Sequence, residues 1–187
     1  MKSLFLCLGL SILTVIHGST SCICTTVPCP EPGENTLIMG NGTAVITYDY
    51  VQHGDFIVVS SANGEITPID LDHGTDTTSC TQQYARMLDD DGVKDCDAGH
   101  ILANRLGGYG NEPLNIFPQD ASVNRGIYAQ FENDIYQCIV SGAKSASLRW
   151  NFAYSNETQT KPNSVEYSAS FNGGDCTEFS DVFTNLG

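Results

Sequence analysis

The stretch DAGHILANRLGGYGNEPLNIFPQDASVNRGIYAQFE, which runs from Asp97 to Glu132, decides how this chain folds and what chemistry it can perform. It contains one histidine, His100, among many asparagine and glutamine side chains. A lone histidine is more often structural or solvated than catalytic. Whether His100 is a loop residue or the base of an active site therefore depends on the residues that follow it.

The second half of this stretch opens the clearest helical pattern in the chain, from Asp120 to Gly142. Asp120 or Ser122 can cap its start, because short polar side chains accept hydrogen bonds from free backbone N–H groups. Gly142 can end it, because glycine tolerates the left-handed backbone conformation found there. Apolar residues recur at helical spacing and predict one buried stripe: Ile127, Phe131, Ile135 and Cys138.

Asn124 and Glu132 lie on one broad face of this predicted helix. At about 100° per residue, their side chains are about 80° apart and two turns from each other. If His100 lies on a strand packed against that face, the set supplies a base, a metal ligand and an acid that orients water. Such a set suits phosphodiester hydrolysis, because a neutral imidazole can activate water and one Mg²⁺ ion needs few protein ligands.

The flanking sequence has the pattern of an antiparallel sheet. Residues 43–50 and 55–61 are rich in β-branched and aromatic residues and predict a hairpin. Residues 61–76 predict a turn and an irregular strand, and residues 84–96 an acidic connector. Two further strands are expected at 147–155 and 164–171. The predicted fold class is α+β, with a mixed, mainly antiparallel sheet and one principal helix.

Four short motifs carry a resemblance to a known family. DAGH at 97–100, NIFPQ at 115–119, NRG at 124–126 and FE at 131–132 occur in this order. Together they resemble the DNA/RNA non-specific endonucleases of the ββα-metal (His-Me finger) superfamily. GHILANRLGGYG at 99–110 is similar to a loop of the secreted-toxin branch. The likeness covers residues 80–187, and the N-terminal third resembles no family.

The resemblance implies a nuclease with a ββα-metal core and assigns the central roles. His100 would be the general base, Asn124 would bind the metal directly, and Glu132 would contact it through water. The cofactor would be Mg²⁺, with Mn²⁺ as an alternative. The substrate would be DNA, RNA or both.

The resemblance also implies roles for residues around this centre. Asn115 would bind near the phosphate or brace the His100 loop, and Asp97 and Gln119 belong to the same supporting group. Arg105 and Arg125 would contact phosphate or stabilise charge in the transition state. Ala98, Tyr128 and Tyr136 stand where many relatives have arginine, tryptophan and arginine, which weakens the expected phosphate clamp.

Composition limits the kind of partner. The chain has 187 residues, which favours one domain, and 22 Asp and Glu residues against 8 Lys and Arg. The formal net charge of −14 repels polyanions, so tight binding of duplex nucleic acid is disfavoured. Arg105 and Arg125 nevertheless lie inside the motif, where a phosphate would bind. No stretch predicts a membrane span.

The N-terminus has the pattern of a secretory signal over residues 1–21, with Lys2 before an apolar run from Leu4 to Ile16. Residues 22–187 would then form a single nuclease domain with a Cys- and Pro-rich arm at 22–42. The seven cysteines after Cys7 are expected to be mostly disulfide-bonded, in a pattern that the sequence leaves open. Sequons at Asn41 and Asn156 suit a secreted glycoprotein.

Several residues have a competing structural interpretation. His53 and His73 are expected to be solvated, and Tyr128 and Phe131 to belong to the core. Gly126 either permits close helix–strand packing or lets the nucleic-acid backbone approach the metal. The DDDG segment at 89–92 fails the spacing of an EF-hand, so a solvated acidic loop is expected. Two other functions stay open: an inactive nuclease-fold binding protein and a secreted cysteine-rich structural protein.

Overall fold

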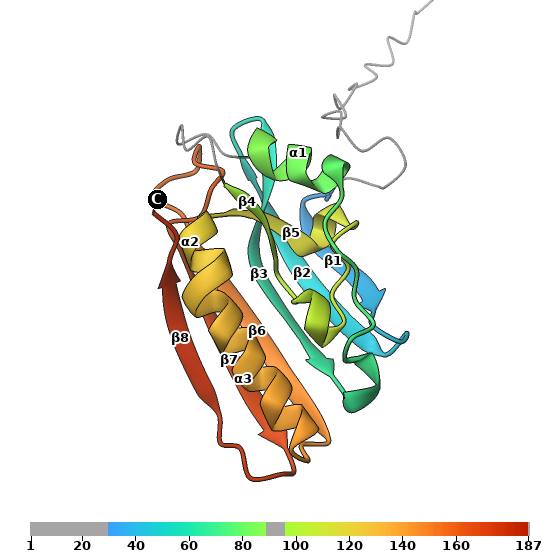
Figure 1. Ribbon diagram of the computed structural model, residues 1–187. Helices are drawn as coiled ribbons and strands as arrows, with labels where there is room; N and C mark the ends of the chain where they lie inside the picture. Colours follow the sequence, from blue (N-terminus) through green and yellow to red (C-terminus); the bar gives the residue numbers. More distant parts are fainter. Residues whose placement is uncertain (1–29, 89–95, 187) are drawn as a thin grey trace, which may run out of the picture.

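The computed structural model describes residues 30–88 and 96–186 as one antiparallel sheet covered on one face by helices and loops (Figure 1). The strands of the sheet follow the order β1-β2-β3-β6-β7-β8, and each pairs with its neighbour antiparallel. Their bounds are β1 Gly33–Met39, β2 Ala44–His53, β3 Phe56–Ile66, β6 Ser145–Ala153, β7 Ser164–Asn172 and β8 Phe179–Thr184.

A second, smaller unit lies on the covered face of the sheet and contains most of residues 97–132, the stretch that carries the four motifs. Strands β4 (Asp97–His100) and β5 (Ile116–Gln119) pair antiparallel. The chain then enters a continuous helical segment made of α2 (Ala121–Val123), the π-helical turn η4 (Asn124–Tyr128) and α3 (Ala129–Val140). Helix α1 is Ser79–Met87, and the short 3₁₀ helices are η1 Pro68–Asp70, η2 Asn104–Leu106 and η3 Pro113–Asn115.

The core forms where α3 packs on the inner face of the sheet. Along β6 and β7, every second residue is buried, as expected for strands with one face toward solvent. Trp150 of β6 and Tyr167 of β7 have no exposed surface, and Phe131 of α3 packs on Tyr167 with 4.7 Å between ring centroids. The predicted principal helix and the predicted core positions of Tyr128 and Phe131 are confirmed.

The predicted helical stripe is wrong at its two ends. Ile127 is 60% exposed, and the buried positions are Tyr128, Phe131, Ile135 and Ile139. The buried positions follow one another at intervals of three or four residues, which is ordinary α-helical spacing. The sheet therefore covers a face centred between Tyr128 and Ile135, and Ile127 lies at the exposed edge of that face. Cys138 is partly exposed because it lies beside the stripe, toward the β7–β8 connection.

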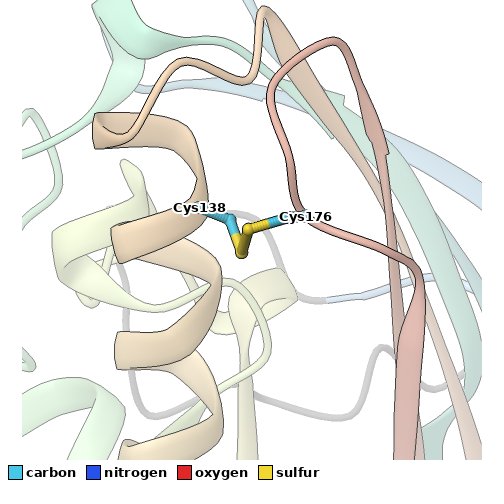
Figure 2. Close-up of a disulfide and its surroundings, with 2 residues drawn as sticks. All are labelled: Cys138 and Cys176. Carbon is cyan, nitrogen blue, oxygen red and sulfur yellow. A yellow bond between two sulfur atoms is a disulfide. The ribbon is translucent and has the colours of Figure 1, made fainter.

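A disulfide joins Cys138 of α3 to Cys176, in the connection between β7 and β8 (Figure 2). The two cysteines are 38 residues apart, so the bond closes a long loop over one edge of the sheet. Cys80 at the start of α1 is also disulfide-bonded. The expected use of cysteines in disulfides is therefore confirmed for these three residues, while Cys22, Cys24 and Cys29 lie outside the described residues.

Replacing both Cys138 and Cys176 with alanine is expected to lower Tm by about 10 °C. A cross-link over a loop of this length contributes about 4 kcal/mol, and each kcal/mol shifts Tm by about 2–4 °C in a domain of this size. Thermal unfolding followed by circular dichroism measures the change. Ser141→Ala, an exposed residue at the same helix end, is the control. An unchanged Tm in the double variant would contradict the prediction.

Three predictions about local structure are wrong. Residues 61–66 continue strand β3 instead of turning, because β3 pairs with both β2 and β6 along this segment. Tyr84–Met87 belong to α1, whose start is capped by Thr78, which accepts a hydrogen bond from the Thr81 backbone N–H. His53 is only 8% exposed, with Nδ1 2.6 Å from the Gln159 carbonyl oxygen. The exposed His73 agrees with prediction.

Two further segments can be placed. Residues 33–39 of the expected N-terminal arm form β1 at the edge of the sheet. The acidic segment at 89–92 and the expected signal at 1–21 lie outside the described residues. Within the described residues, no helix is long and apolar enough to cross a membrane.

Candidate active site

A cavity of 360 Å³ opens between the loop after β4 and the helical segment α2–η4–α3. It brings together four residues that the sequence singled out: His100, Arg105, Asn124 and Glu132. His100 is the last residue of β4, and the other wall comes from η4 and α3. The motif therefore forms one cavity, although its members lie up to 32 positions apart in the sequence.

The contacts of His100 fix which ring nitrogen carries the proton. Its Nε2 lies 3.1 Å from the carbonyl oxygen of Thr75. A carbonyl oxygen only accepts hydrogen bonds, so Nε2 must be the donor and Nδ1 of the neutral ring is the proton acceptor. Burial lowers the pKa of His100, against the opposing effects of the Thr75 hydrogen bond and the charge of Asp76. His100 is therefore neutral and basic at Nδ1 near neutral pH.

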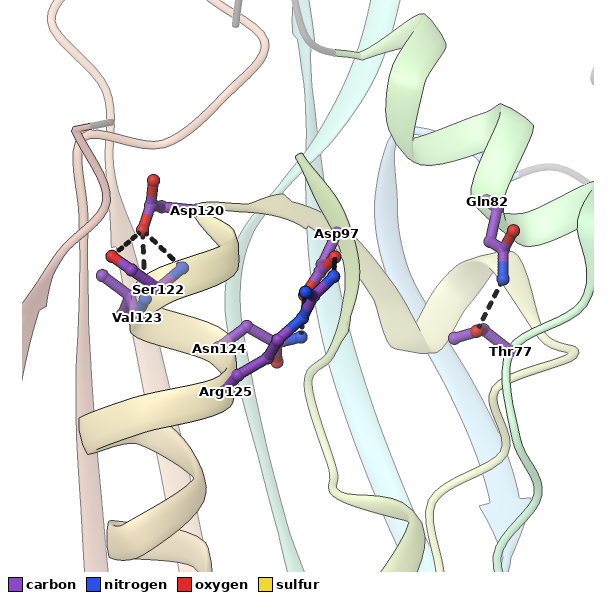
Figure 3. A network of polar contacts seen from close by, with 8 residues as sticks. All are labelled: Thr77, Gln82, Asp97, Asp120, Ser122, Val123, Asn124 and Arg125. Atoms are coloured by element: carbon purple, nitrogen blue, oxygen red, sulfur yellow. Dashed lines mark hydrogen bonds and ion pairs between the residues drawn. The ribbon is translucent and has the colours of Figure 1, made fainter. Parts of the chain in front are cut away.

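Asn124 is held in one orientation by Asp97 (Figure 3). Its side-chain amide donates from Nδ2 to Asp97 Oδ2 at 2.8 Å. Because a carboxylate only accepts, the amide oxygen Oδ1 must face away from Asp97. Asn124 also lines the cavity, so this orientation leaves an oxygen ligand available on the cavity side.

Arg125 contacts Asp97 rather than occupying the cavity. Its guanidinium forms two bonds with this carboxylate, Nε to Oδ2 at 2.8 Å and Nη2 to Oδ1 at 2.5 Å. The Arg125 side chain is 73% exposed, and the paired carboxylate raises its pKa. The structure thus places Arg125 as a partner of Asp97, outside the cavity that contains Glu132 and Arg105.

The start of the helical segment is fixed from both sides. The Asp120 carboxylate accepts hydrogen bonds from the backbone N–H groups of Ser122 and Val123, at 2.9 and 3.0 Å. Of the two predicted caps, Asp120 is therefore the one used. Hydrogen bonds lower the pKa of Asp120. Its own backbone N–H donates to Asn185 at 2.7 Å, which ties the helix start to the C-terminal segment.

Glu132 projects into the cavity from the first turn of α3. Burial raises its pKa to about 8, so without a cation its carboxyl group is largely protonated at neutral pH. A nearby divalent cation favours the carboxylate form. Without a cation, Glu132 therefore carries little negative charge at neutral pH. Beside a divalent cation, its carboxylate is a suitable oxygen ligand.

Arg105 enters the cavity over an aromatic support. Its guanidinium carbon lies 4.0 Å from the ring centroid of Tyr136, and Nη1 donates to Asn133 Oδ1 at 3.3 Å. Tyr136 in turn donates to Asp72 Oδ2 at 2.8 Å. Tyr136 stands where many relatives have arginine, so here the aromatic ring positions an arginine from another segment. The exposed Arg105–Asp72 ion pair, at 3.9 Å, contributes little by itself.

Asn115 is fully buried and braces the loop after His100. Its Oδ1 accepts from the Leu102 backbone N–H at 2.8 Å and from the Tyr48 hydroxyl at 3.0 Å. Its Nδ2 donates to the Leu102 carbonyl oxygen at 2.9 Å. The resemblance implies that Asn115 either binds near the phosphate or braces the His100 loop. The structure favours the second role, because a buried amide cannot reach a substrate phosphate.

Gln119 is also buried, 1% exposed, behind β4. A Cβ at Gly99 would lie 2.2 Å from Gln119 Oε1, so the glycine before His100 is needed for this close approach. The same loop also needs Gly108, where a Cβ would lie 1.7 Å from the Leu102 carbonyl oxygen. These contacts indicate that Gln119 supports the loop around His100. Its side chain is too deeply buried to contact a substrate.

Gly126 lies at a break in the helical backbone, with φ −111° and ψ −110°. Nothing lies within 4 Å of the position that its Cβ would occupy. Close helix–strand packing therefore does not account for this glycine. The open space beside η4 instead fits the alternative, in which a substrate backbone approaches Asn124.

The metal-ligating capacity of the cavity rests on few protein atoms. The described residues contain no group of three or more His, Cys, Asp or Glu that could hold a metal ion. Asn124 Oδ1 and the Glu132 carboxylate are hard oxygen donors on one cavity wall, and Mg²⁺ or Mn²⁺ prefers such donors while keeping several waters. The residues present thus fit a single, largely hydrated divalent cation.

Sequence reasoning missed the residues that support this site from distant segments. Thr75 holds His100, Tyr48 holds Asn115, and Tyr136 supports Arg105. Tyr48 and Thr75 carry no local signal of this role, because their partners are far away in the sequence. Tyr136 could have been found as an aromatic residue one turn after Glu132 on the same helix.

The chain matches a known family over most of its length. The family profile described as DNA/RNA non-specific endonuclease matches residues 49–173. The probable deoxyribonuclease RhsA of Dickeya dadantii (strain 3937) is 35% identical over 133 residues, which cover 71% of this chain. The match covers 9% of that relative, so the chain spans less than a tenth of its length.

Two solved structures of NucA from Streptococcus agalactiae share the fold. The structure with no metal bound has a TM-score of 0.56 and 16% identity, covering 86% of this chain and 84% of NucA. The structure with magnesium bound has a TM-score of 0.53 and 15% identity, covering 88% of this chain and 86% of NucA. The predicted α+β fold is confirmed. Because the family match includes every residue of the cavity, the chain belongs to the DNA/RNA non-specific endonuclease family.

Proposed function

We propose that this chain is a metal-dependent endonuclease that hydrolyses phosphodiester bonds of DNA, RNA or both with little sequence preference. The observation that carries the proposal is the neutral His100, whose Nδ1 accepts protons and whose cavity also contains Asn124 and Glu132. Membership of the nuclease family supports it. An inactive binding protein would need none of these three residues in one cavity.

His100 acts as the general base in this mechanism. Its Nδ1 takes a proton from the water that attacks phosphorus, and the Thr75 carbonyl keeps the ring oriented through Nε2. The imidazolium that forms is stabilised by the charge of Asp76, whose effect on the pKa of His100 opposes the lowering by burial. The base therefore needs no rearrangement to accept its proton.

Asn124 and Glu132 would hold the divalent cation, Mg²⁺ or Mn²⁺. When bound, the cation supplies positive charge to the phosphate and to the departing 3′ oxygen. Asp97 keeps the Asn124 oxygen directed away from its own carboxylate. Arg105, supported on Tyr136, places a further positive charge at the cavity for the phosphate oxygens.

We further propose that the chain is secreted and glycosylated. The signal-like residues 1–21 and the disulfide-bonded cysteines support export to an oxidising compartment. Asn41 and Asn156, the two sequon asparagines, are exposed and lie away from the cavity. N-terminal sequencing of the exported protein and mass loss after glycosidase treatment test these two features. Retention of residues 1–21 in the exported protein would exclude cleavage of the signal.

Incubation of the purified protein with plasmid DNA and with total RNA tests the activity. Cleavage is expected with Mg²⁺ or Mn²⁺ and is expected to fall at least about 100-fold with excess chelator. Among the described residues that line this cavity, Arg105 is the one arginine or lysine, and its single charge does not replace a divalent cation. Gel electrophoresis of both substrates measures it and separates DNA from RNA preference. Intact substrates across both metals and at low salt would contradict the proposed function.

A further inference from the structure

A second cavity of 460 Å³ adjoins the first one, and residues of β4 form part of its lining. His100 and Asn124 line both cavities, so they lie at the junction between them. The second cavity extends from this junction toward α1, and its polar lining includes Thr77, Gln82, Arg86 and Arg125. Two carboxylates also line it: Asp97, which pairs with Arg125, and Asp76, which accepts from Asn104 Nδ2 at 2.7 Å. In the view of Figure 3, Gln82 and Thr77 lie on one side of β4, the strand that begins at Asp97, and Asn124 and Arg125 lie on the other.

Helix α1 presents a polar face to this second cavity. Gln82 and Arg86 are four residues apart and therefore lie on the same face of the helix. The opposite face of α1 is fixed in the core, where Tyr84, Ala85 and Leu88 pack in one buried cluster with Ile116 of β5. Gln82 and Arg86 thus project from a rigid element that packs against the strand pair carrying His100.

A hydrogen bond also ties α1 to the loop after His100. Thr81 donates from its hydroxyl to the Gly110 carbonyl oxygen at 2.7 Å. A Cβ at Gly110 would lie 2.6 Å from His100 Nε2, so this loop lies directly against the histidine ring. These contacts therefore fix the position of Arg86 relative to His100, because α1 is held against the loop and is not free to move.

Three arginines line the two cavities: Arg86, Arg105 and Arg125. They differ in how closely a carboxylate pairs with each guanidinium. Arg125 is paired with Asp97 at 2.5 Å, and Arg105 lies 3.9 Å from Asp72. Arg86 is exposed and takes part in no ion pair within the part of the chain that the structure describes. In a chain with a formal net charge of −14, Arg86 is thus the arginine of this cavity whose guanidinium is available to an anion.

We infer that Arg86, with Gln82, forms a second phosphate subsite, which binds the phosphate next to the one that is cleaved. This inference rests on the proposed function. A polynucleotide cut at His100 and Asn124 continues on both sides of the cut, and the second cavity is the continuation on the α1 side. Arginine donors match phosphate oxygens in two parallel hydrogen bonds. The Gln82 amide makes only a 3.3 Å bond to Thr77 and can turn to the same phosphate.

The test compares Arg86→Ala with Arg149→Ala. Arg149 is an exposed arginine on the outer face of β6, so its removal changes the net charge equally but at a distance from the two cavities. With a single-stranded oligonucleotide, Arg86→Ala is expected to raise KM at least about 10-fold, mainly without loss of kcat, because one charged hydrogen-bonding partner is lost. Arg149→Ala is expected to change KM less than about twofold.

Three further measurements separate a subsite from a structural role. Arg86→Lys is expected to recover part of the affinity, because it keeps the charge without the planar donors. The loss in kcat/KM is expected to be much smaller for bis(p-nitrophenyl) phosphate, which has no neighbouring phosphate. Fluorescence anisotropy in chelator is expected to show weaker oligonucleotide binding by Arg86→Ala, with a salt slope reduced by about 1.

Equal KM values for Arg86→Ala and Arg149→Ala would overturn the subsite. A fall in Tm of Arg86→Ala with unchanged oligonucleotide affinity would also overturn the subsite. It would show instead that Arg86 stabilises the last turn of α1, where it lies. Absence of cleavage by the wild-type protein would instead reject the proposed nuclease function. Because the anisotropy measurement needs no catalysis, it decides on the subsite independently of that result.

Discussion

Replacing His100 with alanine is expected to lower kcat for plasmid DNA by about 10³-fold, within the range of 10²–10⁴ for loss of a general base. The structure gives the reason. His100 Nδ1 is the unprotonated nitrogen because Nε2 donates to Thr75, and among the described residues no other imidazole lines either cavity. Initial rates at saturating Mg²⁺ measure the loss, and Tm confirms that the variant is folded.

His73→Ala is the matched control, because His73 is exposed and lies outside both cavities. Its activity is expected to stay within about twofold of the wild type. Equal activity of the His100 variant and the wild type would reject His100 as the base. Equal residual activity in all preparations would point to a contaminating nuclease.

The pH dependence follows from the same residue. Burial lowers the pKa of His100 below its usual value of about 6.5, and the neutral ring is the active form. Activity is therefore expected to be present above that pKa and to fall as pH decreases through it. The log of kcat/KM against pH, at saturating metal, is expected to show an acid limb that is absent in His100→Ala. An acid limb centred above pH 7 would contradict the lowered pKa.

Replacing Asn124 with alanine is expected to lower activity by about 10²-fold or more and to weaken metal binding. The substitution removes the amide oxygen that faces the cavity, and leaves Glu132 as the remaining oxygen ligand on that wall. A ligand that binds only the folded state raises Tm by mass action. The rise in Tm on adding Mg²⁺ or Mn²⁺ is therefore expected in the wild type and strongly reduced in the variant.

Asn151→Ala is the matched control for this variant. Asn151 is exposed on the outer face of β6, where it donates to Glu166 at 3.1 Å. It is expected to keep both the activity and the metal-induced rise in Tm. A full metal response in Asn124→Ala would remove this residue from the metal site even if activity were lost.

The acidic composition and the nuclease site are compatible because the cationic residues are unevenly placed. Of the 8 Lys and Arg residues, Arg86, Arg105 and Arg125 line the two adjoining cavities. Few phosphate contacts release few counterions, so binding should be weak and should have a shallow salt slope. Such a site fits cleavage of transiently bound substrate better than tight binding of a duplex.

The sequence by itself determined the elements whose signals are local. The Asp120 cap, the helix that carries Asn124 and Glu132, and the strands around Trp150 and Tyr167 follow from capping chemistry and from periods of 3.6 and 2 residues. The ordered motifs also placed His100, Asn124 and Glu132 in one site. The placement of His100 with the other two came from the resemblance to a family, whereas the remaining features depend on residues within a few positions of each other or on a spacing along one helix.

Local signals failed where an apolar pattern fitted two neighbouring faces of one helix. Tyr128 is buried at regular α-helical spacing from Phe131, whereas Ile127 beside it is exposed. The period does not show which of two adjacent apolar residues faces the core, because that depends on which side of the helix the sheet covers. His53 was misjudged for another reason, because its partner Gln159 is 106 positions away.

Only the tertiary structure decided how the site is held. Thr75 fixes the tautomer of His100 from 25 positions away, Tyr48 braces Asn115 from 67, and Arg125 turned out to pair with Asp97. The tertiary structure also placed Arg86 in the lining of the second cavity, together with His100 and Asn124. Each of these contacts joins segments that are adjacent only after the strands and helices have packed. No period or spacing along the chain encodes that adjacency, because it depends on how the strands pair and where the helices pack on the sheet.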